Sequence, residues 1–376
     1  MRIVETPEVD ISEQPVVAAI GAFDGVHLGH IQLFETALEV KSRTGLPVMA
    51  VGFHPHPKSL VKSGDDYDAL LTPLEEKQAL LADLGLDYFW AIPFTREMAQ
   101  LSPRDFAHTY LRRMIRAQHI VCGFNFTFGH KRQGNPQVLR ELGHEMGFEV
   151  SVVPPYTIEG EVVSSTKIRR LLSQGDVEGA SLLLGRPYCI YGPATEGTDV
   201  YRRIGMPTCK VDFPADKFLP KAGVYAAWAR AWAGAPRDAA GCKGAALCRD
   251  LYPGVASLAT TRGCWKSSDS RETGESTVSL EVHLPEFGAW ACSQGIPDMG
   301  ALQSMQLFFV KHIREERRCE GKQHLETKER LEEHQEERMK ADIQAALAAL
   351  APRDTGCRDG GLFTRISAYD RILNAD

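Results

Sequence analysis

The sequence predicts an α/β domain with a parallel sheet, followed by a small antiparallel β domain and a C-terminal helix. Over the first 185 residues, short apolar runs of strand length alternate with segments of helical apolar spacing. Such alternation is typical of a parallel sheet covered on both faces. From about Gly185 onward the helical spacing fades, and short β-like runs separated by turn residues replace it. That change favours a barrel or a sandwich.

Five apolar runs in the first region have strand length and are rich in Val, Ile, Phe and Ala. Two segments between them carry helix start signals: at Thr72 and at Ser102 a hydroxyl residue precedes a proline, with an acidic residue three positions on. That pattern is typical of a capping box with proline at the first helical position. Ligands of parallel sheets bind at the carboxyl ends of the strands, so the residues after each run are of functional interest. The expected strands are Val16–Phe23, Pro47–Phe53, Asp87–Phe94, His119–Phe126 and Phe148–Tyr156.

The second region carries shorter runs, separated by stretches rich in Gly, Ser and charged residues. Residues 313–350 are densely charged and contain a helical stretch, and the residues around Gly360 are predicted to be weakly ordered. We therefore expect an α/β domain over 1–184, a β domain with the charged helix over 185–350, and a weakly ordered tail over 351–376. The expected strands of the β domain are Lys210–Phe213, Val224–Ala231, Val255–Thr260, Val278–Leu284 and Leu307–His312.

The composition is ordinary for a globular protein and argues against several classes. Of 376 residues, 43% are hydrophobic, and 43 basic against 49 acidic residues give a formal net charge of −6. We therefore expect no nucleic-acid partner. No apolar run approaches the ~20 residues that span a membrane, so we expect no membrane association. The N-terminus is too acidic for a signal peptide, and nine irregularly spaced cysteines predict reduced thiols in the cytoplasm. The predicted state is a monomer or weak homo-oligomer.

The strongest functional signal is the segment Gly21–His30, which follows the first expected strand and opens a helix. Glycines at this junction let a ligand approach the backbone, and the helix N-terminus offers free N–H donors and a partial positive charge to an anion. His27 and His30 are three residues apart, so both can donate hydrogen bonds to phosphate oxygens. A lone H-x-x-H pair is more often two histidines on a helix face. Its place behind a strand and a glycine turn favours an anion site.

A second anion-binding signal is the segment Val163–Arg170, which follows the last strand of the α/β region and opens another helix. Hydroxyl groups near a helix start, together with Arg169, can form a second cradle for an anion. Taken alone, a Ser-Ser-Thr run is more often an ordinary N-cap. Its occurrence with the first motif, at the other end of the same domain, favours the functional interpretation.

Two further segments follow strands and carry aromatic side chains. Phe53–Pro57 begins a loop of about 18 residues, and loops of that length are usually functional or mobile. Gly123–Gly129 alternates phenylalanines around Asn125. Alternating phenylalanines are most often core packing, but an apolar slot with one amide also suits a flat polar heterocycle. A zinc site is a further alternative, because zinc-ligand residue types occur in these motifs at His27, His30, His54, His56 and Cys122.

Together these segments resemble the motifs of a known family. GAFDGVHLGH, FHPHP, CGFNFTFGHKRQGN and SSTKIRRLL occur in the order found in the prokaryotic FAD synthetases, which are bifunctional riboflavin kinase/FMN adenylyltransferases. The resemblance implies a Rossmann-like nucleotidyltransferase domain that transfers AMP from ATP, with Mg²⁺, to FMN. It implies ATP contacts from Gly21, Phe23, Asp24, Gly25, His27, Gly29, His30, Ser164, Ser165, Thr166 and Arg169, with His27, His30 and Arg169 catalytic, and FMN contacts from Phe53, Pro55, His56, Asn125 and Phe128.

The resemblance continues more weakly into the second region. Leu184–Tyr188 is similar to the start of the riboflavin kinase module, which implies a small β-barrel. Members of the family carry a threonine and an asparagine for the ATP–magnesium site and a glutamate as the base. Here Thr208 and Glu281 match, but Lys210 stands at the asparagine position. An ammonium group has no lone pair for Mg²⁺, which takes oxygen ligands. Glu281 is also typical of an ordinary solvated strand residue.

Three interpretations therefore remain open. The leading one is an FMN adenylyltransferase with an altered riboflavin kinase-like domain. The second is a fully bifunctional enzyme that also phosphorylates riboflavin to FMN. The third is a flavin-binding regulator without catalysis. The intact histidines and Arg169 of the first two motifs argue against the regulator, whereas Lys210 argues for lost kinase chemistry.

Overall fold

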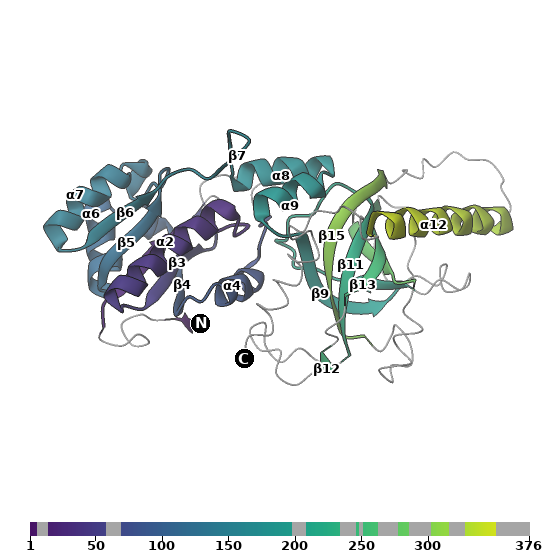
Figure 1. The fold of residues 1–376 in the computed structure, drawn as a ribbon, viewed down its shortest axis with the longest axis horizontal. Helices are drawn as coiled ribbons and strands as arrows, with labels where there is room; N and C mark the ends of the chain where they lie inside the picture. The colour runs from purple at the N-terminus through teal and green to yellow at the C-terminus, as the bar shows by residue number, and fades with distance from the viewer. Residues whose placement is uncertain are drawn as a thin grey trace. The chain divides into compact units, whose positions relative to one another are not determined.

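The structure is a computed structural model, and it divides the chain into two compact units (Figure 1). Among the described residues, one unit comprises Met1–Lys167 and Leu183–Gly185, and the other comprises Ile168–Leu182 and residues 186–350. The predicted tail over 351–376, most of the long loop after Phe53–Pro57 and the loop before Glu281 lie outside the described residues. The structure describes residues 1–5, 14–57, 69–197, 208–233, 246–247, 251–261, 277–285, 302–315 and 328–350.

The first unit is built on a six-stranded sheet in which every pair of neighbouring strands is parallel. The strand order is β1-β4-β3-β2-β5-β6. This confirms the parallel α/β prediction, and all five expected strands form. Strand β1 was not predicted, because three residues at a sheet edge are too few to show a pattern. The strands are β1 (Arg2–Val4), β2 (Val16–Ile20), β3 (Val48–His54), β4 (Tyr88–Pro93), β5 (Ala117–Gly123) and β6 (Glu149–Val153).

Alternate residues of the central strand β2 enter two separate cores, one on each face of the sheet. Val17 packs with residues of helices α2 (Leu28–Thr44) and α4 (Leu74–Asp83). Ala18 packs on the other face with residues of α6 (Pro103–Phe106) and α7 (Pro136–Met146). Figure 1 shows these helices around the sheet. A strand covered on both faces needs apolar residues at every position, which explains why β2 is a continuous apolar run.

One of the two helix start signals works as expected, and the other does not. The Ser102 hydroxyl accepts a hydrogen bond from the Asp105 amide at 3.1 Å and caps α6. At α4 the N-cap is Pro73, without a side-chain cap. The Thr72 hydroxyl instead accepts from the amide of Gly25, far away in the sequence, at 2.9 Å. The capping-box interpretation of Thr72 was therefore wrong.

The remaining elements of this part of the chain are short. A π-helix over Ala107–Met114, which the sequence did not reveal, continues directly from α6. The others are α5 (Arg96–Ala99), the 3₁₀ turn His130–Arg132, the hairpin of β7 (Thr157–Ile158) and β8 (Glu161–Val162), α8 (Ser165–Gln174) and α9 (Val177–Leu184).

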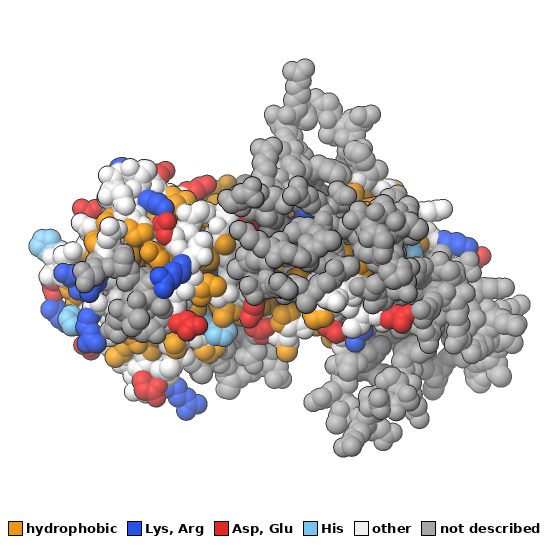
Figure 2. All heavy atoms as spheres, turned by 90° about the horizontal axis from the view of Figure 1, so that it is seen from below, with side chains coloured by type: hydrophobic (Ala, Val, Ile, Leu, Met, Phe, Trp, Pro, Cys, Tyr) orange, Lys and Arg blue, Asp and Glu red, His pale blue; other side chains and the backbone are white. Residues whose placement is uncertain are grey.

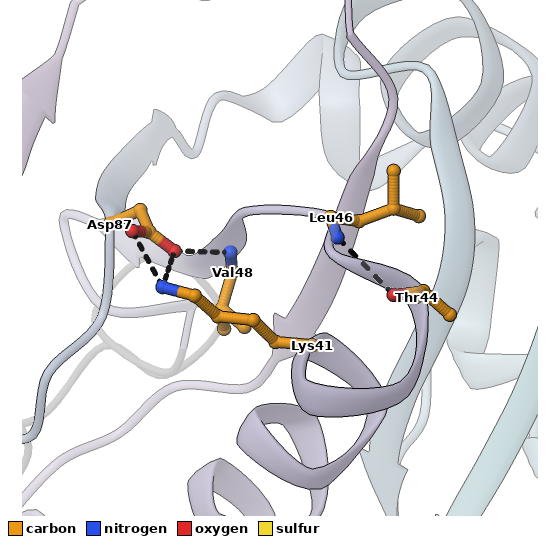
Figure 3. A network of polar contacts seen from close by, with 5 residues as sticks. All are labelled: Lys41, Thr44, Leu46, Val48 and Asp87. Atoms are coloured by element: carbon orange, nitrogen blue, oxygen red, sulfur yellow. Dashed lines mark hydrogen bonds and ion pairs between the residues drawn. The ribbon is translucent and has the colours of Figure 1, made fainter.

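The amino edge of the sheet is fixed by the carboxylate of Asp87 (Figure 3). It accepts hydrogen bonds from Lys41 Nζ at 2.8 and 2.7 Å and from the Val48 amide at 2.7 Å. Beside it, the Leu46 amide donates to the Thr44 hydroxyl at 3.3 Å. These contacts join the end of α2 to the starts of β3 and β4, at the edge opposite the predicted site.

The second unit is a closed antiparallel barrel. Its order β11-β13-β14-β10-β9-β15 closes because β11 also pairs with β15. Closure decides between the barrel and the sandwich, and all five expected strands form. A sixth barrel strand, β9, was not predicted. The strands are β9 (Tyr188–Glu196), β10 (Thr208–Val211), β11 (Gly223–Ala233), β13 (Tyr252–Thr261), β14 (Thr277–His283) and β15 (Ser304–Glu315), with β12 (Ala246–Leu247) added to β11.

Helix α12 (Lys328–Leu350) packs against β11, β13 and β15, as Figure 1 shows. Ala346 and Leu350 are buried. The Arg314 guanidinium donates to both carboxylate oxygens of Asp342, at 2.7 and 2.6 Å. None of the described helices combines the length and apolar character needed to cross a bilayer. In Figure 2 the visible described surface mixes basic and acidic side chains.

We predict a pH-dependent stabilisation by Asp83→Asn at the end of α4. Burial raises the pKa of Asp83 from 3.8 to about 7. The folded state therefore holds the proton more tightly than the unfolded state, and stability falls as the pH rises from 3.8 to about 7. The variant should gain about 1–2 kcal/mol at pH 8 and little at pH 4, after allowing for solvent screening. Urea unfolding at both pH values measures this, and an equal gain at both would contradict it.

Candidate functional site

The predicted motifs of the first unit meet at the carboxyl edge of its sheet. From β2 the chain moves outward through β3 to β4, and then returns to the other side of β2 to form β5 and β6. The direction of strand order therefore reverses between β2 and β5. Ligands of open α/β sheets bind outside such a switch point. The segments after the adjacent strands β3, β2 and β5 are Phe53–Pro57, Gly21–His30 and Gly123–Gly129.

The turn after β2 is buried and has an unusual backbone. Phe23, Asp24 and Val26 are each at most 2% exposed. The φ angles of Phe23, Gly25 and Val26 are 51°, 89° and 41°. A positive φ is a clear outlier for a β-branched residue. Strained backbone of this kind costs of order 1–3 kcal/mol per residue and concentrates at ligand sites, where surrounding contacts must hold it.

The two predicted histidines lie face to face at the start of α2. His27 is the N-cap residue, and its ring stacks on the ring of His30, with centroids 3.7 Å apart and planes 15° apart. The edge of Phe23 contacts the His30 ring at 5.4 Å. A Cβ added at Gly29 would lie 3.3 Å from the His27 ring. The absence of a side chain at Gly29 therefore leaves room for the His27 ring.

The backbone of the same helix start can bind an anion. The amides of His30 and Ile31 already donate to the His27 carbonyl at 2.7 and 3.0 Å. The amides of Leu28 and Gly29 precede them, so helix geometry gives them no acceptor within α2. The first turn carries no acidic residue. Two amide donors, the helix dipole and the two imidazoles thus form a site that suits a phosphate.

Asp24 and Ser165 of the second motif support this turn. Asp24 is 2% exposed, its carboxylate accepts from the Thr72 amide at 3.2 Å, and its carbonyl accepts from the Ser165 hydroxyl at 2.8 Å. The Ser164 hydroxyl accepts from the Lys167 amide at 3.3 Å, as an N-cap does. The side chains of Asp24 and Ser164, two residues that are predicted to contact ATP, therefore accept hydrogen bonds from amides of the protein.

Thr166 and Arg169 are the other two residues of the second motif that are predicted to contact ATP, and their surroundings are different. Thr166 is exposed. Arg169 groups with the second unit, where its guanidinium lies 5.7 Å from the centre of the Phe218 ring. The motif thus contributes residues to both units, which its sequence did not indicate.

The segments predicted to bind FMN are linked by a cluster of aromatic rings. The Phe53 ring packs against Phe94 and Phe106, and Phe106 contacts Phe128, which stacks on Phe126. Phe128 is 6% exposed and belongs to the core. Its ring packs within this cluster, and its contact with FMN stays a prediction. The sequence analysis missed Phe106, although it directly follows the start signal at Ser102.

The polar members of these segments are more accessible. Asn125 and Pro55 are exposed, and His56 is half-buried. Asn125 lies just beyond the carboxyl end of β5, next to the switch point. Among the described residues, no group of three His, Cys, Asp or Glu side chains is arranged to hold a metal ion.

In the barrel, the predicted kinase residues lie on neighbouring strands. In the ladder between β10 and β14, Thr208 pairs with His283 and Lys210 pairs with Glu281. Strand alternation puts all four side chains on one face. Burial, and secondly the charge of Glu281, raise the pKa of the Cys209 thiol to about 12.

The Thr208 hydroxyl fits a ligand role. Its oxygen is buried and has no hydrogen-bond partner among the described residues. A Cβ added at Gly197 would lie 2.2 Å from it, so only glycine fits there. A buried unpaired hydroxyl requires an explanation, and an oxygen is the ligand type that Mg²⁺ takes. Lys210 does not fit such a site. Its side chain is exposed, and its ammonium lies 3.5 Å from Asp212.

Fold and site together define a class of protein: an α/β domain with a site that suits a phosphate, followed in the chain by a six-stranded barrel. Family models for FAD synthetase and riboflavin kinase match residues 10–167 and 184–344. A bifunctional riboflavin kinase/FMN adenylyltransferase of Escherichia coli K12 is 35% identical over 214 residues, 57% of this chain and 68% of that protein. The chain belongs to the family of bifunctional riboflavin kinase/FMN adenylyltransferases.

Other comparisons agree with this membership. The Listeria monocytogenes and Bacillus subtilis proteins of the same description are 37% and 36% identical. Each alignment covers 56% of this chain and 66% of the relative, just under two thirds of its length. A crystal structure described as a macrolide-efflux protein from Streptococcus pneumoniae has a TM-score of 0.71 at 23% identity, over 92% of this chain and 98% of that one. At that identity the likeness shows the fold alone.

We predict that Gly25→Ala destabilises the first unit more than Gly160→Ala. Both glycines have positive φ, 89° and 81°, so both variants carry a backbone cost of about 1–2 kcal/mol. A Cβ at Gly25 would also lie 2.9 Å from Leu71 Cδ1, whereas Gly160 has open space around it. The difference in the free energy of unfolding should be about 1–3 kcal/mol. Urea denaturation measures it, and equal losses would show that the turn yields to the added methyl group.

Proposed function

We propose that the chain makes FAD by transferring AMP from ATP to FMN. The observation that carries this proposal is the glycine and histidine turn at the sheet's switch point, in a chain that belongs to this family. In the reaction, an FMN phosphate oxygen forms a bond to the α-phosphorus of ATP. The bond from that phosphorus to the β-phosphate bridging oxygen breaks, and pyrophosphate leaves with the electron pair. The products are FAD and pyrophosphate.

The residues of the first unit would catalyse this step by alignment and charge stabilisation. FMN brings a nucleophile that is already anionic, so no protein nucleophile is required. His27, His30 and the amides of Leu28 and Gly29 would hold phosphate oxygens of ATP as charge develops on them. The resemblance to the family also implies that Arg169 neutralises charge on phosphate groups of ATP. Mg²⁺ bound with ATP would offset charge on the phosphate groups.

We further propose that the isoalloxazine ring of FMN binds beside Phe53–Pro57 and Asn125. The aromatic cluster beneath these segments gives the site a rigid apolar floor, and Asn125 presents an accessible amide next to the switch point. One amide over an apolar surface suits a flat heterocycle with polar edges. His56, half-buried in the same segment, would contact the polar part of FMN.

A second activity, riboflavin phosphorylation, is favoured by the unpaired Thr208 hydroxyl and by Glu281 on the neighbouring strand. Thr208 would hold Mg²⁺, which would offset charge on the ATP phosphates, and Glu281 would accept the proton of the riboflavin hydroxyl. We propose that this activity is absent or strongly reduced. Lys210 replaces an oxygen ligand with a cation on the same face of β10 as Thr208.

We predict that His30→Ala and Arg169→Ala each slow FAD formation ~10²-fold or more. Loss of one charge-assisted contact to a reacting phosphoryl group costs roughly 2–4 kcal/mol in the transition state. The matched controls are His144→Ala and Arg170→Ala, whose side chains are exposed. HPLC of purified protein with ATP, Mg²⁺ and FMN measures the rate. Near wild-type turnover in both variants would refute the assignment of His30 and Arg169.

We predict that wild-type protein forms little FMN from riboflavin and that Lys210→Asn raises the rate at least ~10-fold. The substitution restores an amide oxygen and removes a positive charge that repels a divalent metal by several kcal/mol at ~4 Å and an effective dielectric constant of 20. Thr208→Val added to Lys210→Asn should abolish the gain, because it removes the hydroxyl oxygen that is proposed to hold Mg²⁺. Rapid phosphorylation by wild type would overturn the argument and establish the bifunctional alternative.

A further inference from the structure

The segment Leu71–Lys77, at the start of α4, holds the phosphate-binding turn through contacts that differ in kind. Thr72 makes two hydrogen bonds: its hydroxyl accepts from the Gly25 amide at 2.9 Å, and its amide donates to the Asp24 carboxylate at 3.2 Å. Lys77 Nζ donates to the Ala22 carbonyl at 3.1 Å. Leu71 fills the space where Gly25 lacks a side chain. We call this segment the brace.

The brace acts on the part of the turn that cannot keep its shape alone. Phe23 and Val26 have positive φ angles, which are strained for residues with a side chain, and such strain persists only where surrounding structure over-determines the backbone. Asp24 and Gly25 are consecutive residues. The Asp24 carboxylate accepts a hydrogen bond from the Thr72 amide, and the Gly25 amide donates one to the Thr72 hydroxyl. The Thr72 backbone and side chain thus fix two consecutive residues, only a few positions before the histidines of α2.

Lys77 is an unusual member of the brace. It is 4% exposed although it lies on a helix that covers the sheet. Burial of an ammonium group is costly unless it is hydrogen-bonded and paired, and lysine is almost never fully buried without such partners. Its ammonium group donates a hydrogen bond to the Ala22 carbonyl, which ties α4 to the start of the turn.

We propose that Thr72 and Lys77 are positioning residues for ATP: they set the turn from Gly21 to Val26, and thereby place His27, Leu28 and Gly29 against the phosphates. The proposal rests on the proposed adenylyl transfer. Neither residue touches the substrate in this view, because both act through Ala22, Asp24 and Gly25. The Thr72 signal was visible in the sequence, but as a helix start rather than as part of the ATP site.

The test separates positioning from mere folding. Thr72→Val keeps the shape of the side chain and removes the acceptor for Gly25, whereas Thr72→Ser keeps that acceptor. Thr36→Val is the matched control, because the Thr36 hydroxyl bonds only within α2, to the Gln32 carbonyl at 2.9 Å. Lys77→Met removes the charge at similar length. Steady-state FAD formation gives kcat and the two KM values, and urea unfolding gives stability.

We expect Thr72→Val and Lys77→Met to raise the KM for ATP ~10-fold, with the KM for FMN changed less than ~2-fold. Thr72→Ser should restore the wild-type KM for ATP, and Thr36→Val should leave it unchanged. An unchanged KM for ATP in folded Thr72→Val and Lys77→Met would overturn the proposal. So would equal rises in the KM for ATP and for FMN. If Thr72→Val does not fold, Lys77→Met and Thr72→Ser still decide the question.

Calorimetric binding of a non-hydrolysable ATP analogue distinguishes failure of this proposal from failure of the proposed reaction. If wild type forms no FAD, the adenylyl transfer is refuted. The brace then stands only if wild type binds the analogue and Thr72→Val and Lys77→Met bind it ~10-fold more weakly. If wild type forms FAD and all variants bind the analogue equally, the brace is wrong and the reaction stands.

Discussion

The hydrogen bond from the Gly25 amide to the Thr72 hydroxyl joins two segments that are 47 residues apart in the chain. With the Asp24 contacts to Thr72 and Ser165, it makes a buried network around a turn whose backbone would otherwise relax. The groups at the start of α2 that suit a phosphate lie just after this turn. They are the stacked imidazoles of His27 and His30 and the amides of Leu28 and Gly29, with Gly29 fitting closely against the His27 ring. The site is therefore pre-organised by contacts between distant segments, which is how proteins hold donors ready for developing charge.

Much of the fold could be predicted from local sequence patterns. The continuous apolar run of β2 predicted a strand buried on both faces, and the Ser102 signal correctly started α6. Thr72 carried the same signal and was misinterpreted. A threonine hydroxyl can accept a hydrogen bond from an amide of its own helix or from an amide far away in the sequence, and the two bonds are chemically alike. No local pattern separates the two. The π-helix after Phe106 and the burial of Lys77 were missed for the same reason, since both depend on tertiary packing.

The candidate site was predictable where chemistry requires rare residues in order, and less so where packing decides. His27, His30 and Gly29 lie together, as their spacing after a strand indicated. Phe128 shows the other case: its ring was a candidate for FMN but packs in the core, the commoner fate of a phenylalanine. The candidate site in the barrel is an intermediate case. Lys210 and Glu281 could be matched by motif, but only the strand register shows that they face each other.

The two ends of the first sheet have a consequence for the protein in concentrated solution. Its outermost strands are β1, with three residues, and β6, which begins with the exposed Glu149 beside His119, 3.2 Å away. Exposed strand edges are templates for pairing with other chains, and short or charged edges discourage such pairing. The short strand β1 and the charged strand β6 thus discourage strand-to-strand aggregation of the parallel sheet. The candidate site lies elsewhere, at the carboxyl ends of the strands.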